Sequence, residues 1–160
     1  MQVLSRLAPL LLLAALTCNA ATFEGRVVGV SDGDTITVLD STNTQHKVRL
    51  SGIDAPEKKQ AFGQRSKESL SDLVFDKPVT VDTDKQDRYG SDVGEALVNG
   101  QGANLEQINR GLEWHYTAYE RERQAIDRKV YAEQKAAPKP LGGAWGLMPS
   151  LCRWDFRHNK

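Results

Sequence analysis

Three acidic side chains lie close to the ends of predicted strands, where they could hold a cation between them. Asp34 comes just after a predicted turn, Asp54 lies where a predicted strand ends, and Glu57 follows it after Ala55 and Pro56. In an antiparallel meander, the start of the second strand and the end of the third are neighbours, so these carboxylates are expected to converge at one rim. Convergent carboxylates repel unless a cation lies between them, and oxygen ligands favour a hard ion such as Ca²⁺.

Arg49 and Ala55 would complete a site for a phosphodiester. Arg49 lies on the polar face of the third predicted strand, five residues before Asp54, and a guanidinium beside an acidic metal site is suited to bind phosphate. Pro56 favours an extended Ala55, whose carbonyl can then face the same site. The alternative is that the acids are turn residues that bond nearby backbone amides, and that Arg49 is a solvated strand residue.

The elements that must position these residues begin with a three-stranded antiparallel meander between residues 23 and 54. Apolar and polar residues alternate there with a period of two, which is typical of strands that bury one face. The polar segments 31–34 and 40–44 are short enough to be hairpin connections. The apolar residues expected on one face of each strand in turn are Val28 and Val30, Ile36 and Val38, and Val48 and Leu50.

A helix and two further strands are predicted after the meander. Ser66, Leu70, Leu73 and Val74 recur at the spacing of one helix face. Alternation resumes at residues 79–82 and again at about 93–98, which predicts a fourth and a fifth strand joined by a polar loop.

Two more helices are predicted toward the end of the chain. Asn104 and Gln107 have the spacing of a capping box, and a third helix is expected over residues 117–137. Five strands with a helix after the third and helices at the end predict an α+β fold, a five-stranded Greek-key barrel of the oligonucleotide/oligosaccharide-binding (OB) type with about three helices. The strand pattern also allows other small barrels.

The composition favours one soluble domain. The 160 residues are 39% hydrophobic and 26% charged, which excludes collagen-like, low-complexity and multi-span membrane proteins. Lys and Arg number 21, as do Asp and Glu, so no global field attracts a charged polymer. Contact with nucleic acid would therefore need a local basic patch.

The N-terminus is predicted to be an export signal over residues 1–20. A charged start with Arg6 precedes an apolar run too short to span a membrane, and small residues follow. Removal of this segment leaves a net charge of about −1, counted with ordinary pKa values. It also leaves Cys152 as the single cysteine, so no internal disulfide is expected. The mature protein is predicted to be secreted or periplasmic, without a membrane anchor.

Several segments together resemble the staphylococcal (micrococcal, thermostable) nuclease family. The resemblance runs from about residue 23 to residue 145, and the combination is specific although each motif alone is weak. It implies a nuclease domain over residues 21–146 followed by a C-terminal tail, 147–160. The segments that carry it are Asp-Gly-Asp-Thr at 32–35, Val-Arg-Leu-Ser-Gly-Ile-Asp-Ala-Pro-Glu at 48–57, Asp-Arg-Tyr-Gly at 87–90, and Asn104 to Leu112.

The resemblance implies a Ca²⁺-dependent endonuclease on an OB-fold barrel that cuts DNA and RNA to leave 3′-phosphates. By that resemblance, Asp34 and Asp54 would bind Ca²⁺ through side chains and Ala55 through its carbonyl, where the family often has Thr. Glu57 would orient or deprotonate the attacking water. Arg49 would clamp the phosphate, since its two directional donors are not reproduced by Lys.

The resemblance also implies residues that bind the substrate. Arg88 and Tyr89 would lie at a terminal-phosphate pocket, and Tyr116 or Tyr119 could line a nucleotide-base pocket. No His is required, and the scattered His residues are expected to be structural or solvent-facing. No stable protein partner is implied, and a monomer is expected.

Position 91 departs from the family. An arginine that stabilises the transition state follows the Tyr-Gly pair in the family, whereas this chain has Ser91. Loss of such a donor costs on the order of 10²- to 10⁵-fold in rate. Arg88, three positions away, would point to the opposite face of a regular strand. The alternatives are therefore a catalytically impaired module that still binds nucleic acid, and a structural or protein-interaction barrel in which the acids are turn residues.

Overall fold

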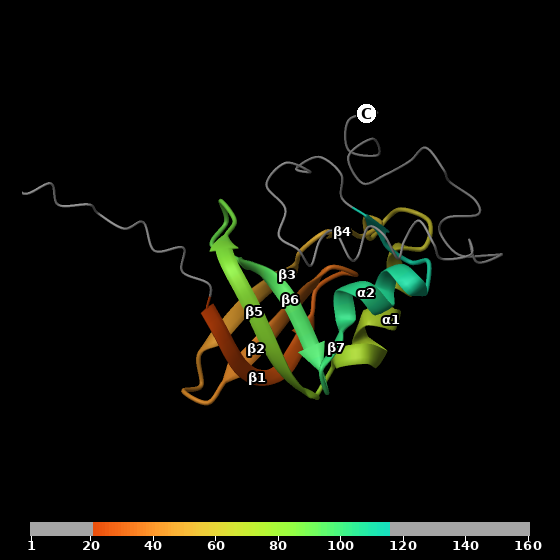
Figure 1. Cartoon of the computed structure of the whole chain (residues 1–160). Helices are drawn as coiled ribbons and strands as arrows, with labels where there is room; N and C mark the ends of the chain where they lie inside the picture. Colours follow the sequence, from red (N-terminus) through yellow and green to blue (C-terminus); the bar gives the residue numbers. More distant parts are fainter. Residues whose placement is uncertain (1–20, 116–160) are drawn as a thin grey trace, which may run out of the picture.

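The predicted meander is present in the computed structural model, which describes residues 21–115 (Figure 1). Strand β1 (Ala21–Val30) pairs with β2 (Thr35–Asp40), and β2 pairs with β3 (Gln45–Leu50), in both cases antiparallel. The predictions that lie outside the described residues are the signal over 1–20, the third helix over 117–137, the roles of Tyr116 and Tyr119, and the tail 147–160.

Two later strands close the meander into a barrel. Strand β5 (Pro78–Gln86) pairs with β1, and β6 (Asp92–Val98) pairs with β5, again antiparallel. The first three residues of β6 then pair in parallel with β3, from Val48 to Leu50. The strand order β3-β2-β1-β5-β6 thus returns to β3, which confirms the predicted five-stranded OB-fold barrel.

Three very short strands lie outside the closed ring. Strand β7 (Gln101–Gly102) continues the sheet beyond β6. Strand β4 (Ile53–Asp54), just after β3, pairs with β8 (Trp114–His115) as a separate two-residue ladder. This ladder ties the chain after the second helix to the segment that carries Asp54.

The barrel core is filled by the alternating apolar residues of its strands. Branched aliphatic side chains at successive inward positions suit a pleated, buried surface. Almost no solvent reaches them. The core residues contributed by the strands of the barrel are Val27, Ile36, Val38, Val48, Leu50, Val79, Val81 and Ala96.

The prediction for the face of the first strand was wrong at Val28. Val28 is 39% exposed, whereas its neighbour Val27 is fully buried. Val30 is partly buried and packs against the core. The register with β2 shifts between Val27 and Gly29. A β-bulge of this kind adds a residue to one strand and breaks the period of two, so alternation does not reveal the inward face.

His46 has a structural place where β3 meets β6. Its Nε2 lies 2.9 Å from Oδ2 of Asp40, and its Nδ1 lies 3.5 Å from Oδ2 of Asp92. The ring also packs against Phe23, with centroids 4.5 Å apart. These contacts agree with the expectation that His46 is a structural residue.

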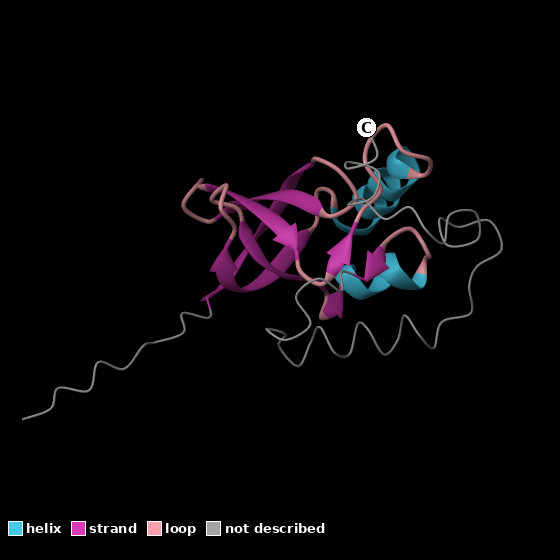
Figure 2. Ribbon diagram, turned by 90° about the horizontal axis from the view of Figure 1, so that it is seen from above, coloured by secondary structure: helices cyan, strands magenta, loops and turns pink. Residues whose placement is uncertain are grey.

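Two helices lie together on one side of the barrel (Figure 2). Helix α1 (Gly63–Val74) follows β4, and α2 (Ala103–Asn109) follows β7. Helix α1 ends where Lys77 Nζ donates to the carbonyls of Asp72 and Leu73 at 2.7 and 2.9 Å, which satisfies two of its last acceptors. Neither helix within residues 21–115 is long and apolar enough to cross a membrane.

The predicted capping box at Asn104 and Gln107 is absent from α2. Gly102 is the N-cap residue, and no side chain bonds to the free amides of the first turn. Asn104 donates instead to the carbonyls of Ser51 and Gly94, at 2.9 and 3.3 Å, and accepts from the amide of Ala96. Both predicted cap residues are buried, so their polar groups bond to neighbouring elements instead.

Candidate active site

Asp34 joins the start of β2 to the end of β3. Its carboxylate is 0% exposed, and Oδ1 accepts a hydrogen bond of 2.8 Å from the hydroxyl of Thr35. Its backbone carbonyl accepts the amide of Leu50 at 2.8 Å. The amide of Ala55 lies 3.5 Å from Oδ2. The hairpin geometry therefore brings a turn residue against the residue that follows Asp54.

Arg49 lies beside the same carboxylate. It is the register partner of Thr35 in the β2–β3 ladder, so its side chain starts next to Asp34. Its Nη2 is 4.0 Å from Oδ2 of Asp34, and the Arg49 side chain remains 35% exposed. The guanidinium thus has one edge toward a buried acid and access to solvent, where a phosphate could reach it.

Asp54 lies on β4 and is almost completely buried. Its strand partner is Trp114 of β8. The negative charges of Asp34 and Asp54 both contribute to raising the pKa of a third residue, the buried Glu113. The structure thus brings together Asp34, Arg49 and Ala55, with Asp54 adjoining them.

Glu57 lies on the loop that leads into α1. Its amide donates to Oε1 of Gln60 at 3.1 Å, and its carbonyl accepts the amide of Gln60 at 2.7 Å. Gly63 packs so closely on the Glu57 carbonyl that a Cβ there would collide with it. The described residues contain no group of three or more His, Cys, Asp or Glu side chains arranged to hold a metal ion.

Glu113 is a buried acid that the sequence reasoning missed. Its Oε1 accepts hydrogen bonds from the hydroxyl of Ser66 and, at 3.3 Å, from Nε2 of Gln107. Burial raises its pKa well above the ordinary value of 4.5, and the charges of Asp34 and Asp54 raise the pKa further. Glu113 directly precedes β8, but no local pattern distinguishes it from a solvent-exposed glutamate.

The β5–β6 loop lies at the Arg49 end of the barrel. Asp87 Oδ1 accepts the amides of Tyr89 and Ser91 at 2.8 and 2.9 Å. Burial alone would raise the pKa of Asp87, but the two amide hydrogen bonds and the positive charges of Arg49 and Lys47 together lower it below the ordinary value. Asp87 therefore holds the loop closed beside Arg49.

Ser91 and Arg88 differ sharply in exposure within this loop. Ser91 is only 4% exposed and cannot present a positive charge to a substrate. The guanidinium carbon of Arg88 lies 4.9 Å from the centre of the Tyr89 ring, and Tyr89 is 75% exposed. Arg88 and Tyr89 thus form an exposed cation–π contact in the β5–β6 loop.

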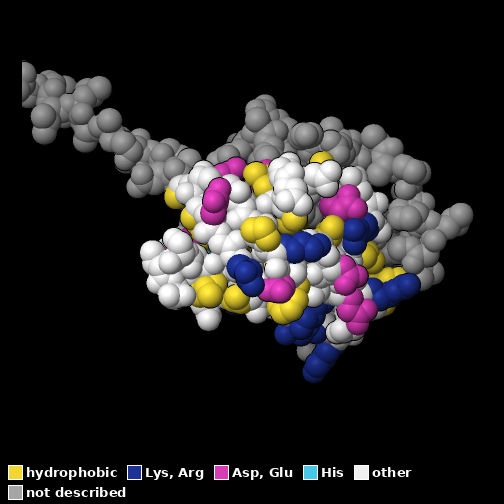
Figure 3. Space-filling view, turned by 90° about the horizontal axis from the view of Figure 1, so that it is seen from below, with side chains coloured by type: hydrophobic (Ala, Val, Ile, Leu, Met, Phe, Trp, Pro, Cys, Tyr) yellow, Lys and Arg dark blue, Asp and Glu magenta, His cyan; other side chains and the backbone are white. Residues whose placement is uncertain are grey.

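The charges on one face of the molecule are mixed. On the face drawn in Figure 3, Lys and Arg side chains are interleaved with Asp and Glu side chains. This agrees with the equal numbers of basic and acidic residues in the sequence. A polyanion that binds this face would therefore contact local basic groups rather than a surface of uniform charge.

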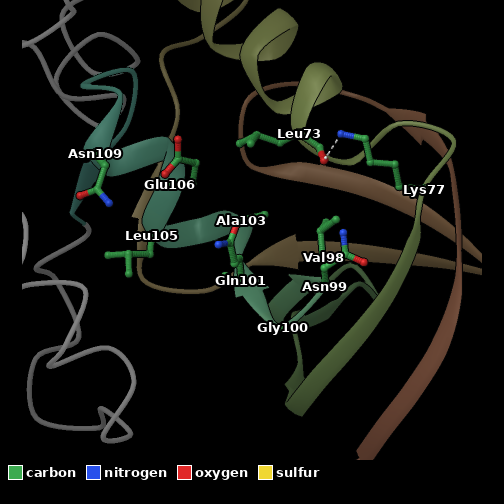
Figure 4. Close-up of a pocket in the computed structure, with 11 residues that line it drawn as sticks. Leu73, Lys77, Val98, Asn99, Gly100, Gln101, Ala103, Leu105, Glu106 and Asn109 are labelled. Carbon is green, nitrogen blue, oxygen red and sulfur yellow. Dashed lines mark hydrogen bonds between the residues drawn. The ribbon is translucent and has the colours of Figure 1, made fainter.

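A pocket of about 530 Å³ lies away from these residues, between the end of α1, the β6–β7 turn and α2 (Figure 4). Its lining includes Leu73, Val98 and Leu105 and none of the predicted site residues. Val98 ends β6, whereas Val93 near the start of the same strand is the register partner of Arg49. The pocket is therefore separate from the candidate active site.

The sequence is similar to proteins that are named as nucleases. A family model described as staphylococcal nuclease homologue matches residues 47–146. A Haemophilus influenzae protein named uncharacterized endonuclease is 41% identical over 127 residues, 78% of this chain and 68% of the relative. An Escherichia coli protein of the same name is 37% identical over 141 residues, 88% of each chain. A Shigella flexneri protein named micrococcal nuclease is 36% identical over 146 residues, 86% of this chain and 82% of the relative.

Proposed function

Because this chain belongs to the staphylococcal nuclease homologue family, we propose that it is a Ca²⁺-dependent endonuclease. It hydrolyses phosphodiester bonds of DNA and RNA and leaves 3′-phosphate ends. The observation that carries the proposal is the meeting of Arg49 with the buried Asp34 beside Ala55, next to Asp54, at one end of the barrel.

The donor set of this site fits a hard cation. Asp34, Asp54 and the carbonyl of Ala55 offer only oxygen, which Ca²⁺ prefers, and water can fill its remaining positions. Two buried carboxylates that both act on Glu113 also place negative charge where a cation would relieve repulsion. When bound, Ca²⁺ would neutralise charge on a phosphate oxygen and stabilise the five-coordinate phosphorus.

Side chains of the protein would bind the phosphate, accept the proton of the attacking water and bind the rest of the substrate. Arg49 would donate two directional hydrogen bonds to the phosphate, and its partial exposure leaves room for that contact. Glu57, on the loop after β4, would accept a proton from the attacking water. Arg88 and Tyr89 would bind a terminal phosphate, and Tyr116 or Tyr119 a base.

The test of the proposal is cleavage of a labelled single-stranded DNA and a labelled RNA by the purified chain, with Ca²⁺ and with chelator. We expect cleavage with Ca²⁺ only. The variants Asp34→Ala and Arg49→Lys should each lose on the order of 10²-fold or more in rate. Products should gain a 3′-hydroxyl on treatment with a 3′-phosphatase. A wild-type rate no higher than that of Asp34→Ala would overturn the proposal.

A second candidate function rests on Ser91. Its neutral, nearly buried hydroxyl stands where the family has an arginine, so the barrel could bind nucleic acid and cleave it slowly. The variant Ser91→Arg separates the two functions. A rise of about 10²-fold or more in kcat, with little change in nucleic-acid affinity, would support the impaired module. A fully active wild type whose rate does not rise would support the endonuclease.

We also propose that the protein works after export, as a monomer that needs no stable protein partner. The export part of this proposal rests on the apolar segment and small residues within positions 1–20. Fractionation of cells that express the full chain tests it. A full-length product retained in the cytoplasm would contradict it.

A further inference from the structure

A cluster of buried polar side chains lies directly beneath the turn that carries Asp34. Ser66 comes from α1, Gln107 from α2, and Glu113 from the segment before β8. All three are buried, and each is hydrogen-bonded to another member of the cluster. Nothing in the proposed chemistry uses them, so their cost of burial needs another explanation.

Gly33 is the point where this cluster meets the turn. A Cβ built on Gly33 would collide with the hydroxyl of Ser66 and with Oε1 of Glu113. The backbone of the turn therefore rests on these two side chains, and only glycine fits between them. Because Asp34 is the next residue, a shift of this contact would move its carboxylate.

Gln107, on α2, is hydrogen-bonded to the backbone of the Gly33 turn. Its Nε2 lies 3.3 Å from the carbonyl of Gly33, 3.1 Å from that of Ser66 and 3.3 Å from Oε1 of Glu113. Its Oε1 accepts the hydroxyl of Ser69 at 2.7 Å, and that bond orients the amide so that its nitrogen faces the turn.

We infer that Glu113 is a positioning residue which, with Gln107 and Ser66, supports the Gly33 turn and so sets the place of Asp34 in the ion site. The inference rests on the proposed function of that site. Glu113 Oε1 is the acceptor shared by Ser66 and Gln107, so it joins both helices to the turn. Outer-shell partners of this kind typically change metal affinity by about 10- to 100-fold when removed.

The experiment measures Ca²⁺ affinity by titration calorimetry, together with thermal unfolding in chelator, for the full chain and three variants. Glu113→Ala removes the shared acceptor and should weaken Ca²⁺ binding by about 10-fold or more. Glu113→Gln keeps a side-chain oxygen of the same reach and should retain the wild-type affinity within about 3-fold. Nuclease activity is not needed for this readout.

Val74→Ala is the matched control. Val74 is fully buried on α1 and belongs to the apolar core. Its truncation should lower the unfolding temperature and leave the Ca²⁺ dissociation constant unchanged, because packing is lost without a change at the turn. A drop in affinity with Val74→Ala equal to that with Glu113→Ala would reduce the effect to general stability and overturn the inference.

The remaining outcomes separate this inference from the proposed function. If the wild type binds Ca²⁺ and the Glu113→Ala variant binds it with equal affinity, the positioning role is wrong and the proposed function stands. A wild type that does not bind Ca²⁺ would overturn both. If Glu113→Ala does not fold, Gln107→Leu takes its place, since it removes the bond to the Gly33 carbonyl. It is expected to weaken binding in the same direction.

Discussion

At the scale of single residues, the site has to accommodate several acids in little space. Asp34 and Asp54 are buried, and both act electrostatically on the fully buried Glu113. Arg49 offers one positive charge at 4.0 Å from Asp34. A buried acid without a compensating cation is stable only if it stays protonated. Without a bound ion, protonation of Glu113 therefore reduces the electrostatic repulsion among these three acids.

This protonation predicts a pH-dependent effect of Glu113→Gln on stability. The pKa of Glu113 is raised in the folded state, so above its ordinary value of 4.5 the unfolded chain releases a proton that the folded chain keeps. Stability from this group is fully present below that value and is lost as pH rises toward the folded pKa. Glutamine does not titrate, so the variant should gain on the wild type as pH increases.

Urea unfolding of both proteins in chelator, from pH 4 to pH 8, measures this difference. Other titrating groups are shared by the two proteins, so their effects cancel in the comparison. The free energy of unfolding of the variant, relative to wild type, should increase steadily above about pH 4.5. A difference that stays constant across this range would mean that the pKa of Glu113 is the same in the folded and the unfolded protein.

At the scale of elements, local patterns predicted the barrel well because each strand and turn is specified by nearby residues. The alternation around Ile36 and Val38 and the polar hairpin segments were sufficient to place Asp34 beside the end of β3. The bulge at Val27 to Gly29 could not be predicted, since the extra residue is accommodated by pairing with another strand.

Asn104 and Gln107 show how tertiary packing overrides a local sequence pattern. Their spacing is that of a capping box, yet both side chains are buried and bond across to other elements. The burial of these side chains depends on how α2 packs against α1 and β6. The sequence of the seven residues of α2 carries no information about that packing. Glu113 was missed for the same reason, because it is buried against Ser66, Gln107 and the Gly33 turn, which are distant in sequence.

At the scale of the whole molecule, the candidate site lies where one end of the barrel meets the segments after β3 and α2. The turn before β2 supplies Asp34, β3 supplies Arg49 and β4 supplies Asp54, and side chains from both helices contact that turn at Gly33. An ion bound there would therefore contact segments distant in sequence. Such an ion stabilises the folded chain alone, because the unfolded chain does not hold its ligands together.

Thermal unfolding with and without Ca²⁺ tests whether these segments form one ion site. At about 100 times the dissociation constant, binding adds about 2.7 kcal/mol, which for a chain of this length raises the unfolding temperature by roughly 5 to 10 °C. Asp34→Ala should abolish the increase, because it removes a ligand from the turn, whereas Val28→Ala on the exposed face of β1 should preserve it. An increase that survives Asp34→Ala would place the ion elsewhere. No increase in the wild type would leave the acids as turn residues of a structural barrel, since a ligand that binds only the folded state must stabilise it.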